Sequence, residues 1–236
     1  LGGGVFLVST KPFPFTGYKP DLTRDGIRTA EVRSLFVDSD KNLWMGIGTY
    51  GMALQEFGSK EVRFYTHIPE FSDIETVETV NAIIQRSNGD LWFGTHDGGV
   101  LVYRKGEKVR RLRKEDVPSF YSDCVTALYE DHEGNCWIGC RGGFGVSTVG
   151  GRHHKFERMV FENGGESDWF QVNDFVEDRD GSFWIATSNC GLLRLTGEVR
   201  SPRTLKCYNY SLNNRLLSTN TVLCFHKDRF GRLWVG

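Results

Sequence analysis

Tryptophan recurs along this chain at a nearly constant spacing, and this period constrains the fold more than any other feature. Successive members of the series are 48, 45, 47 and 50 residues apart: Trp44, Trp92, Trp137, Trp184 and Trp234. Twelve residues before each of them is a valine, and nine residues before each is a large apolar residue. Agreement at three positions in five copies, at a period of this size, is typical of a tandem-repeat architecture.

Each copy reads as short β-strands joined by tight turns. In one copy a β-branched and apolar run at 80–86 is followed by a turn and by a second strand centred on Trp92. Three copies carry D-x-x-G in this turn, where Asp accepts backbone N–H groups and Gly takes a positive φ: Asp131–Gly134, Asp178–Gly181 and Asp228–Gly231. Where Lys41-Asn42 replaces the glycine, we expect Asn42 to take the left-handed conformation. These turns predict β-hairpins.

The remainder of the repeat supplies two more strands. A glycine or alanine stands two residues after each Trp, which predicts close approach of another backbone. A third strand, such as 100–103, and an outer fourth strand, such as 63–67 or 205–210, follow. Four short antiparallel strands per repeat of about 45 residues predict an all-β fold, a β-propeller. Because stacked blades would bury the tryptophans between sheets, we interpret the Trp series as structural.

The phase of the repeat predicts the blade boundaries. We expect blades at 30–76, 77–121, 122–168 and 169–218, the end of a blade at 1–29 and the start of another at 219–236. Both ends cut a blade at almost the same phase. We therefore expect the chain to be a fragment forming an arc of about five blade repeats from a larger propeller, with a closed five-bladed ring as the alternative.

Composition excludes several classes of partner. There are 29 Lys and Arg against 30 Asp and Glu, and this balance argues against nucleic acid, whose binders carry a clustered basic face. No run of about 18 apolar residues occurs, so no membrane contact is predicted in this segment. The cysteines lack zinc-site spacing, so we predict no metal and no cofactor, and mostly buried free thiols: Cys124, Cys136, Cys140, Cys190, Cys207 and Cys224.

The repeat consensus V-x-x-[LIF]-x-x-D-x-x-G-x-[LF]-W-[IFV]-G-T-x-x-G-G resembles the two-component regulator propeller repeat, and Val80–Tyr103 is its cleanest copy. The resemblance covers essentially the whole chain. It implies the periplasmic sensor region of Bacteroidetes hybrid two-component histidine kinases, in which two seven-bladed propellers precede an immunoglobulin-like domain, a membrane span and kinase modules. It also implies recognition of an oligosaccharide and a homodimer of the full-length parent, anchored in the inner membrane.

A ligand site is expected on one set of loops. The turns after the Trp strands and the loops before the Val strands emerge on the same face, and the D-x-x-G turns emerge on the other. Because residues in those loops differ between copies while the scaffold repeats, they carry what is specific to this protein. The candidates are Tyr50, His96, Asp97, Arg141, Ser188, Asn189, Arg28, Glu78, Asp123, Trp169, Gln171 and Asn220.

Trp169 is the strongest candidate because it lies outside the repeat series and interrupts a polar loop. A sugar site needs a flat aromatic platform, which Trp169 would supply, although packing under its own loop is an equal alternative. Arg141, beside two glycines, would form two hydrogen bonds to a carboxylate or to a pair of hydroxyls. The alternative is that Arg141 forms a surface salt bridge. His96-Asp97 forms a polar pair that turn chemistry alone would explain.

An enzyme is the rival hypothesis from another class. A propeller lyase or glycosidase needs a pair of carboxylates or a base with a metal, whereas the acidic residues of these loops are scattered and no nucleophile motif occurs. We therefore predict no catalysis by this fragment, although its full-length parent would be a kinase. A third hypothesis is that the chain is a protein-interaction scaffold.

Overall fold

The computed structural model describes residues 5–7, 16–18, 31–77, 79–117, 120–147, 153–156, 158–195 and 204–236. It confirms the all-β prediction: apart from three short 3-10 turns, the regular elements of these residues are strands. The chain divides into two compact units, one formed by Leu1–His96 with Leu101–Arg110 and the other by Asp97–Val100 with Arg111–Gly236. We call them unit 1 and unit 2 and describe each by itself.

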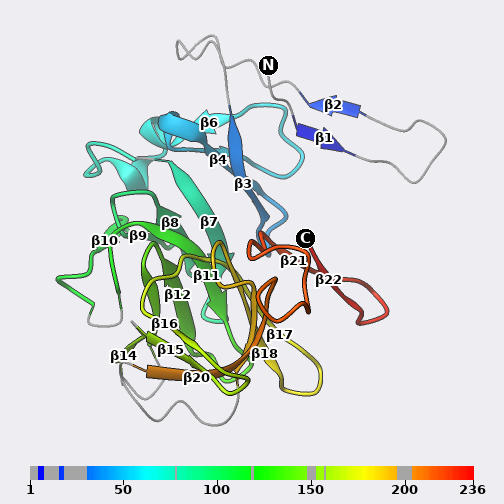
Figure 1. Cartoon of the computed structure of the whole chain (residues 1–236). Helices are drawn as coiled ribbons and strands as arrows, with labels where there is room; N and C mark the ends of the chain where they lie inside the picture. The colour runs from blue at the N-terminus through cyan, green and yellow to red at the C-terminus, as the bar shows by residue number, and fades with distance from the viewer. Residues whose placement is uncertain are drawn as a thin grey trace. The chain divides into compact units, whose positions relative to one another are not determined.

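Unit 1 contains two four-stranded antiparallel sheets and a separate strand pair (Figure 1). The pair is β1 (Val5–Leu7) with β2 (Thr16–Tyr18). The first sheet runs in order through β3 (Val32–Val37), β4 (Leu43–Ile47), β5 (Met52–Gln55) and β6 (Arg63–Phe64). The second runs through β7 (Val80–Gln85), β8 (Leu91–Thr95), β9 (Val100–Tyr103) and β10 (Arg110–Leu112). The 3-10 turns are η2 (Gly48–Tyr50), η3 (Tyr65–His67) and η4 (Pro69–Phe71).

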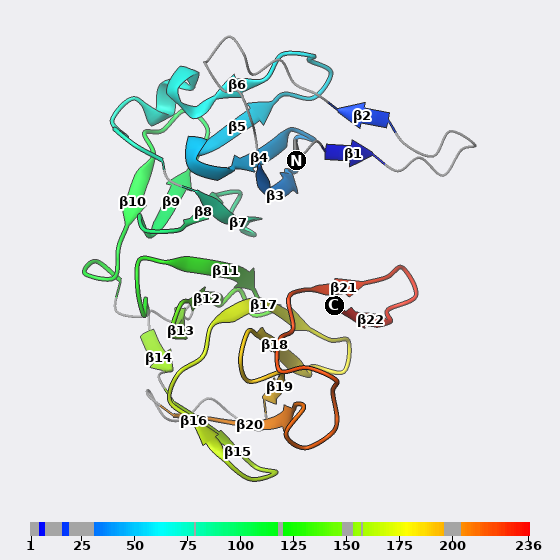
Figure 2. The ribbon, with the colours of Figure 1, turned by 45° about the horizontal axis from the view of Figure 1, so that its top comes forward.

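Unit 2 repeats this plan, as its sheets in Figure 2 show. One sheet consists of β11 (Val125–Glu130), β12 (Cys136–Cys140), β13 (Gly143–Ser147) and β14 (His153–Phe156). The next contains β17 (Val172–Glu177), β18 (Phe183–Thr187), β19 (Leu192–Leu195) and β20 (Thr204–Tyr210). A final pair is β21 (Phe225–Lys227) with β22 (Leu233–Val235). Each four-stranded sheet is a β-propeller blade.

A hairpin of β15 (Arg158–Phe161) and β16 (Glu166–Ser167) departs from the expected boundary at residue 168. That boundary assigned the hairpin to the third blade. Instead β15 pairs in parallel with β20, so the hairpin extends the outer edge of the fourth blade to a six-stranded sheet. A parallel partner lying so far along the chain leaves no local pattern in the sequence.

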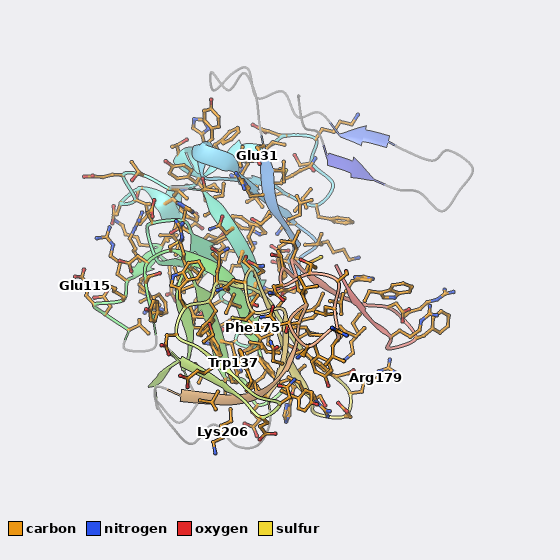
Figure 3. The ribbon with its side chains drawn as sticks, viewed as in Figure 1. Glu31, Glu115, Trp137, Phe175, Arg179 and Lys206 are labelled. Atoms are coloured by element: carbon orange, nitrogen blue, oxygen red, sulfur yellow. The ribbon has the colours of Figure 1, made fainter. Side chains whose placement is uncertain are left out.

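Aromatic side chains fill the space between the sheets of each unit. In unit 1, Trp44 from β4 lies 5.2 Å from both Phe93 and Tyr103, measured between ring centroids. In unit 2, Trp137 lies 6.2 Å from Phe175 of the next blade, and both are labelled in Figure 3. Trp137 is also stacked on Phe183 of that blade, with the ring centroids 4.3 Å apart. Adjacent blades are thus held by interdigitated rings, which add geometric specificity to the apolar area that they bury.

The innermost strands of adjacent blades are also joined by hydrogen bonds. The Ser34 hydroxyl donates to the Val80 carbonyl at 2.8 Å, and the Thr126 hydroxyl donates to the Val172 carbonyl at 2.6 Å. A β-bulge follows the valine in each of the four inner strands β3, β7, β11 and β17. Such bulges bend a strand and increase its twist, and the repeat pattern alone did not reveal them.

Glycine two residues after Trp does permit close backbone approach. A Cβ on Gly46 would lie 2.4 Å from the Val80 carbonyl oxygen, and one on Gly139 would lie 2.8 Å from a Val172 methyl. Both distances are far below van der Waals contact. These two glycines therefore let β4 and β12 approach the inner strands β7 and β17 of the next blade.

The D-x-x-G turns have the expected backbone. Gly134, Gly181 and Gly231 have φ of 80°, 79° and 81°, and each N–H donates to the carbonyl of the preceding aspartate. The prediction for the first copy was wrong: Lys41 has φ 67°, not Asn42. The Asn42 side chain instead donates to Asp38 and accepts from the Phe57 N–H, so it joins the turn to the residues after β5.

In three copies the turn aspartate makes a further contact that the pattern did not predict. Its carboxylate accepts a hydrogen bond from the indole N–H of the tryptophan six residues later. This bond joins Trp44 to Asp38 at 2.9 Å, Trp137 to Asp131 at 2.8 Å and Trp234 to Asp228 at 3.1 Å. The first two tryptophans are buried, but Trp234 is 57% exposed. The structural interpretation as a buried ring is thus wrong for Trp234 in this chain.

Trp92 and Trp184 are packed differently. Arg86 stands where the aspartate would be and lies 4.9 Å from the Trp92 ring centroid, and Arg194 lies 5.5 Å from that of Trp184. The indole N–H of each is buried without a hydrogen-bond partner among the described residues. Asp178 lies six residues before Trp184, but it forms an ion pair with Lys227 at 3.3 Å instead.

No helix in the described part of the chain is long and apolar enough to cross a membrane.

Candidate functional site

Eight of the predicted site residues belong to unit 2 and two to unit 1. The unit 2 residues lie in loops after β12 and β18 and before β11, β17 and β21, together with the segment that precedes β9. They are Asp97, Asp123, Arg141, Trp169, Gln171, Ser188, Asn189 and Asn220. In unit 1, Tyr50 ends η2, and His96 follows β8. Arg28 and Glu78 lie outside the described residues.

Arg141 and Gln171 are directly opposite each other in an isolated antiparallel bridge between the third and fourth blades. Opposed residues of an antiparallel pair point to the same side, and a residue two positions along an extended chain does so too. Trp169 precedes Gln171 by two, and its ring is 56% exposed. The bridge therefore favours a common side for the Arg141 guanidinium and the Gln171 amide, and the exposed Trp169 stands two residues before Gln171.

Asn189 holds the Trp169 loop in place. Its side-chain N–H₂ donates to the Trp169 carbonyl at 2.6 Å, and its side-chain oxygen accepts the Gln171 N–H at 3.3 Å. The Ser188 N–H donates to the Gln171 carbonyl at 3.0 Å. Asn189 thus positions the loop through hydrogen bonds that already use both ends of its amide.

Asn173 is a polar residue of this region that the sequence analysis missed. Its side-chain oxygen accepts from Gln171 Nε2 at 3.2 Å and from the Ser188 hydroxyl at 2.9 Å. Its side-chain N–H₂ donates to the Val222 carbonyl at 2.7 Å. Its place on the first strand, one residue after the repeated valine, was the available signal, because Thr126 occupies the same phase and donates across blades in the same way.

Asn220 has a structural role at the next loop. Its side-chain oxygen accepts the Leu212 N–H at 2.8 Å, and its carbonyl accepts the Gly191 N–H at 2.8 Å. The neighbouring Thr221 hydroxyl donates to the Ser188 carbonyl at 2.6 Å. These bonds order the loops after β18 and before β21 with respect to each other.

Asp123 also has a structural role, because it joins its own loop to two other segments of unit 2. One carboxylate oxygen accepts the Lys114 N–H at 2.7 Å, and the Asp123 carbonyl accepts the Gly99 N–H at 2.9 Å. Beside it the pKa of the Cys124 thiol is raised, first by burial and then by the charge of Asp97, while Arg141 opposes the shift. Asp97 and Arg141 are therefore both within electrostatic range of Cys124.

The backbone of Arg141 bonds to Cys124 and Ser122, but its exposed guanidinium has no hydrogen-bond or ion-pair partner among the described residues and is available to a ligand. Gly142, which follows it, has φ 98°, and a Cβ there would lie 2.7 Å from the Tyr121 ring. Only glycine fits both the backbone angle and this contact. The Tyr121 ring thus covers the turn that presents Arg141.

In unit 1 the candidates form no comparable group. The Tyr50 ring is 40% exposed at the end of η2, and the His96 N–H donates to the Thr79 carbonyl at 2.9 Å. Nothing among the described contacts of unit 1 joins them into one site.

One carboxyl of unit 2 is buried near the loops. Asp174 replaces the small residue of the other copies on the inner strand, and it accepts the N–H groups of Phe175 and Phe225, each at 2.8 Å. Burial raises its pKa, and these two hydrogen bonds oppose the shift. Asp174 therefore ties β17 to β21, and no second carboxylate is paired with it among the described residues. No group of three metal-ligating side chains occurs there either.

Comparison with protein families supports the repeat assignment. The sequence model of the family described as two component regulator propeller matches residues 76–97, 122–142, 171–189 and 216–236. These segments contain the loop residues Arg141, Gln171, Ser188 and Asn189. No curated protein matches the sequence.

Solved structures share the fold at low sequence identity. One is the extracellular domain assigned to the hybrid two component system BT3049 from B. thetaiotaomicron: identity is 18%, TM-score 0.66, and coverage 94% of this chain and 28% of that chain. PorZ, a surface component of the type-IX secretion system of Porphyromonas gingivalis, has 19% identity, TM-score 0.65, and coverage of 94% and 33%. The chain thus spans about a third or less of these two proteins.

An enzyme has the same fold. Virginiamycin B lyase from Staphylococcus aureus is 12% identical, with a TM-score of 0.60 over 86% of this chain and 62% of that chain. At such identities the likeness concerns the fold alone, so the choice between binding and catalysis depends on the residues of this chain.

Proposed function

We propose that this chain is part of the ligand-sensing, extracytoplasmic propeller of a hybrid two-component sensor, because the family model of the two component regulator propeller matches four of its segments. The ligand is an oligosaccharide bound at the loops of unit 2. Binding biases the arrangement of propellers in a periplasmic homodimer of the parent, and the bias reaches a kinase that controls transcription.

The observation that carries this proposal is the group formed by Trp169, Gln171 and Arg141. An exposed indole offers a flat apolar face to the C–H groups of a sugar ring. The Gln171 amide and the unpartnered Arg141 guanidinium supply planar hydrogen-bonding groups for hydroxyl pairs or a carboxylate. Hydrogen bonds from Asn189 and Asn173 fix the loop beforehand, which lowers the entropy lost on binding.

A binding titration tests the proposal. The chain would be titrated with neutral and uronic-acid oligosaccharides of four to six residues, with heat as the readout. We expect one class of oligosaccharide to bind, and Trp169→Ala to weaken it by at least tenfold, about 1.4 kcal/mol. Trp234→Ala is the matched control, because its ring is equally exposed, at 57%, but lies outside these loops. Equal loss in both variants, or no binding by any oligosaccharide, would contradict the proposal.

We propose binding without catalysis at this site. Retaining and inverting glycosidases need two carboxyl groups within about 10 Å. Asp123 already accepts the Lys114 N–H, and Asp174 is occupied by two backbone donors. Incubating the bound oligosaccharide with the chain for a day should leave it intact by mass spectrometry, whereas cleavage or a new unsaturated end would favour the enzyme hypothesis.

A further inference from the structure

Unit 1 contains a cavity between its first and second blades that the proposed function does not use. It opens at the end of the sheets where the β3–β4 and β7–β8 turns lie, and its volume is about 290 Å³. This volume is at the lower end of small-ligand pockets, which begin at about 300 Å³. The cavity would therefore hold a small molecule or one functional group of a larger one.

Rigid aromatic and aliphatic side chains form its floor. Tyr103 is stacked on Phe71 with the ring centroids 5.8 Å apart and the planes at 16°, and Trp44 lies 5.2 Å from Tyr103. Leu54 and Leu91 complete the apolar floor and are almost fully buried. Because these rings are locked by their neighbours, the cavity keeps its shape without a ligand.

Two polar contacts fix the walls. On one side Arg63 donates to Glu56 at 2.6 Å. On the other side the Ser39 N–H donates to the Gln85 side-chain oxygen at 2.7 Å, which joins the turn of the first blade to the inner strand of the second. The walls are thus held by groups that satisfy each other.

Other polar groups of the lining remain open. The Tyr103 hydroxyl and the Asp40 carboxylate have no hydrogen-bond partner among the described residues. Glu70 accepts the Gly106 N–H at 3.2 Å with one oxygen, and its other oxygen has no partner there. A ligand could therefore bond to Glu70, Tyr103 and Asp40 without displacing an existing contact.

The net negative charge of the residues that line the cavity favours a cationic ligand. Four acidic residues, Asp38, Asp40, Glu56 and Glu70, face two basic residues, Arg63 and Lys105, a difference of two negative charges. Burial raises the pKa of Tyr103 to about 12, and the charge of Glu70 adds to the shift. The acidic majority of the lining repels anions and attracts cations.

We propose that this cavity between the first two blades binds a small organic cation, with its ammonium or guanidinium group between the Glu70 carboxylate and the Tyr103 hydroxyl and with Asp40 at the mouth. The apolar part of the cation lies on Leu54, Leu91 and the Tyr103 ring. Lys105 at the rim carries a like charge, so it lowers the affinity. No residue of this cavity belongs to the loops of unit 2, so either site can fail without the other.

The test uses the whole chain labelled with ¹⁵N and three probes that share a butyl chain: n-butylammonium, n-butylguanidinium and neutral n-butanol. Amide shifts of Gly89, Gly106 and Lys105 report on the cavity. We expect at least one of the cations to saturate these shifts in the millimolar range, and butanol to bind at least tenfold more weakly. Glu70→Gln should weaken the cation about tenfold, Tyr103→Phe by less, and Lys105→Ala should strengthen it severalfold.

Glu75→Gln is the matched control, since it removes one exposed carboxylate of unit 1 that does not line the cavity. Circular dichroism would confirm that each variant is folded. Equal binding of butanol and the cations, or equal losses from Glu70→Gln and Glu75→Gln, would overturn the proposal. Tenfold tighter binding of a lysine-containing pentapeptide than of n-butylammonium would also overturn it, because the occupant would then be a protein side chain.

Discussion

The third and fourth blades place tryptophan at the same phase of the repeat but hold it in two ways. Trp137 is buried, stacked on Phe183 and bonded to Asp131, whereas Trp184 is partly exposed beneath Arg194 with its N–H unpaired. The first two blades show the same contrast, with Trp44 bonded to Asp38 and Trp92 beside Arg86. One sequence signature thus serves two packing arrangements, and the partner of the indole N–H distinguishes them.

The second blade shows how the missing aspartate is replaced. Arg104 bonds to both oxygens of Asp90, at 2.6 and 3.0 Å, next to the Trp92 strand. Burial by itself would raise the pKa of Asp90, but hydrogen bonds from Arg104 and Asn88 outweigh it and hold the pKa below its usual value. The blade therefore closes its turn with an ion pair instead of an Asp–Trp bond.

Replacing Trp137 or Trp184 of unit 2 by alanine gives the largest expected difference. Trp137→Ala removes a buried ring that touches Phe144, Phe175 and Phe183, so we expect a loss of about 3–5 kcal/mol in the free energy of unfolding. Trp184→Ala should cost about 1–2 kcal/mol, because its ring is partly exposed. Urea unfolding followed by circular dichroism measures both, and equal losses would show that the two arrangements are energetically the same.

Replacing the turn aspartates tests the same comparison, with smaller expected losses in the free energy of unfolding. Asp131 accepts from the Asn135 N–H, the Asn135 side chain and the Trp137 indole, at 2.8–2.9 Å. Asp131→Ala leaves the indole N–H unpaired, and we expect a loss of about 2–3 kcal/mol. Asp178→Ala loses a bond to the Arg179 N–H and a partly exposed ion pair to Lys227, together about 1 kcal/mol. A larger loss for Asp178→Ala in the same unfolding assay would contradict this ranking.

The smallest expected effect is a change of stability with pH, which comes from a contact between the turn of the third blade and the inner strand of the fourth. The His132 ring is hydrogen-bonded to Glu177, and this bond, followed by the charge of Glu177, raises the pKa of His132. A raised pKa in the folded state means that the contact stabilises fully below the unfolded pKa of about 6.5 and loses this contribution as pH rises through the folded pKa. In the first two blades Ser39 and neutral Gln85 make the equivalent contact.

We therefore expect the stability difference between the wild-type chain and His132→Asn to be greatest near pH 5.5 and to vanish by about pH 9. Gln85→Ala is the control, since loss of its neutral contact should cost the same at both pH values. A His132→Asn difference that does not change with pH would mean that the ion pair contributes nothing.

The sequence predicted the parts of the fold that repeat. Valine, tryptophan and D-x-x-G recur in phase, so the strands, the hairpin turns and the close approach at Gly46 and Gly139 could be derived from one copy and applied to the others. Contacts that depart from the repeat could not be predicted from the sequence. The parallel pairing of β15 with β20 depends on chain segments that only the folded structure brings together. The indole bond of Asp131 is local, but Asp178 has the same spacing from Trp184 and pairs with Lys227 instead, so the spacing alone does not predict the bond.

The loops were predicted as a set but not in their individual roles. The structure pairs Arg141 with Gln171 in one bridge, two residues after the exposed Trp169, whereas the side-chain oxygens of Asn189, Asn220 and Asp123 accept backbone N–H groups. Polar residues in variable loops serve both purposes, and a single sequence does not separate them. Whether the first three bind a ligand stays a prediction.

Mapping the amides that respond to an oligosaccharide tests the central claim most directly. With the ¹⁵N-labelled chain and a bound oligosaccharide, the account predicts the largest shift changes at Arg141, Trp169, Gln171 and Ser188, on the loops that differ between blades. Changes concentrated instead in the repeated turns Asp131–Gly134 and Asp178–Gly181 would contradict it, because the ligand would then bind the scaffold at the opposite end of the sheets.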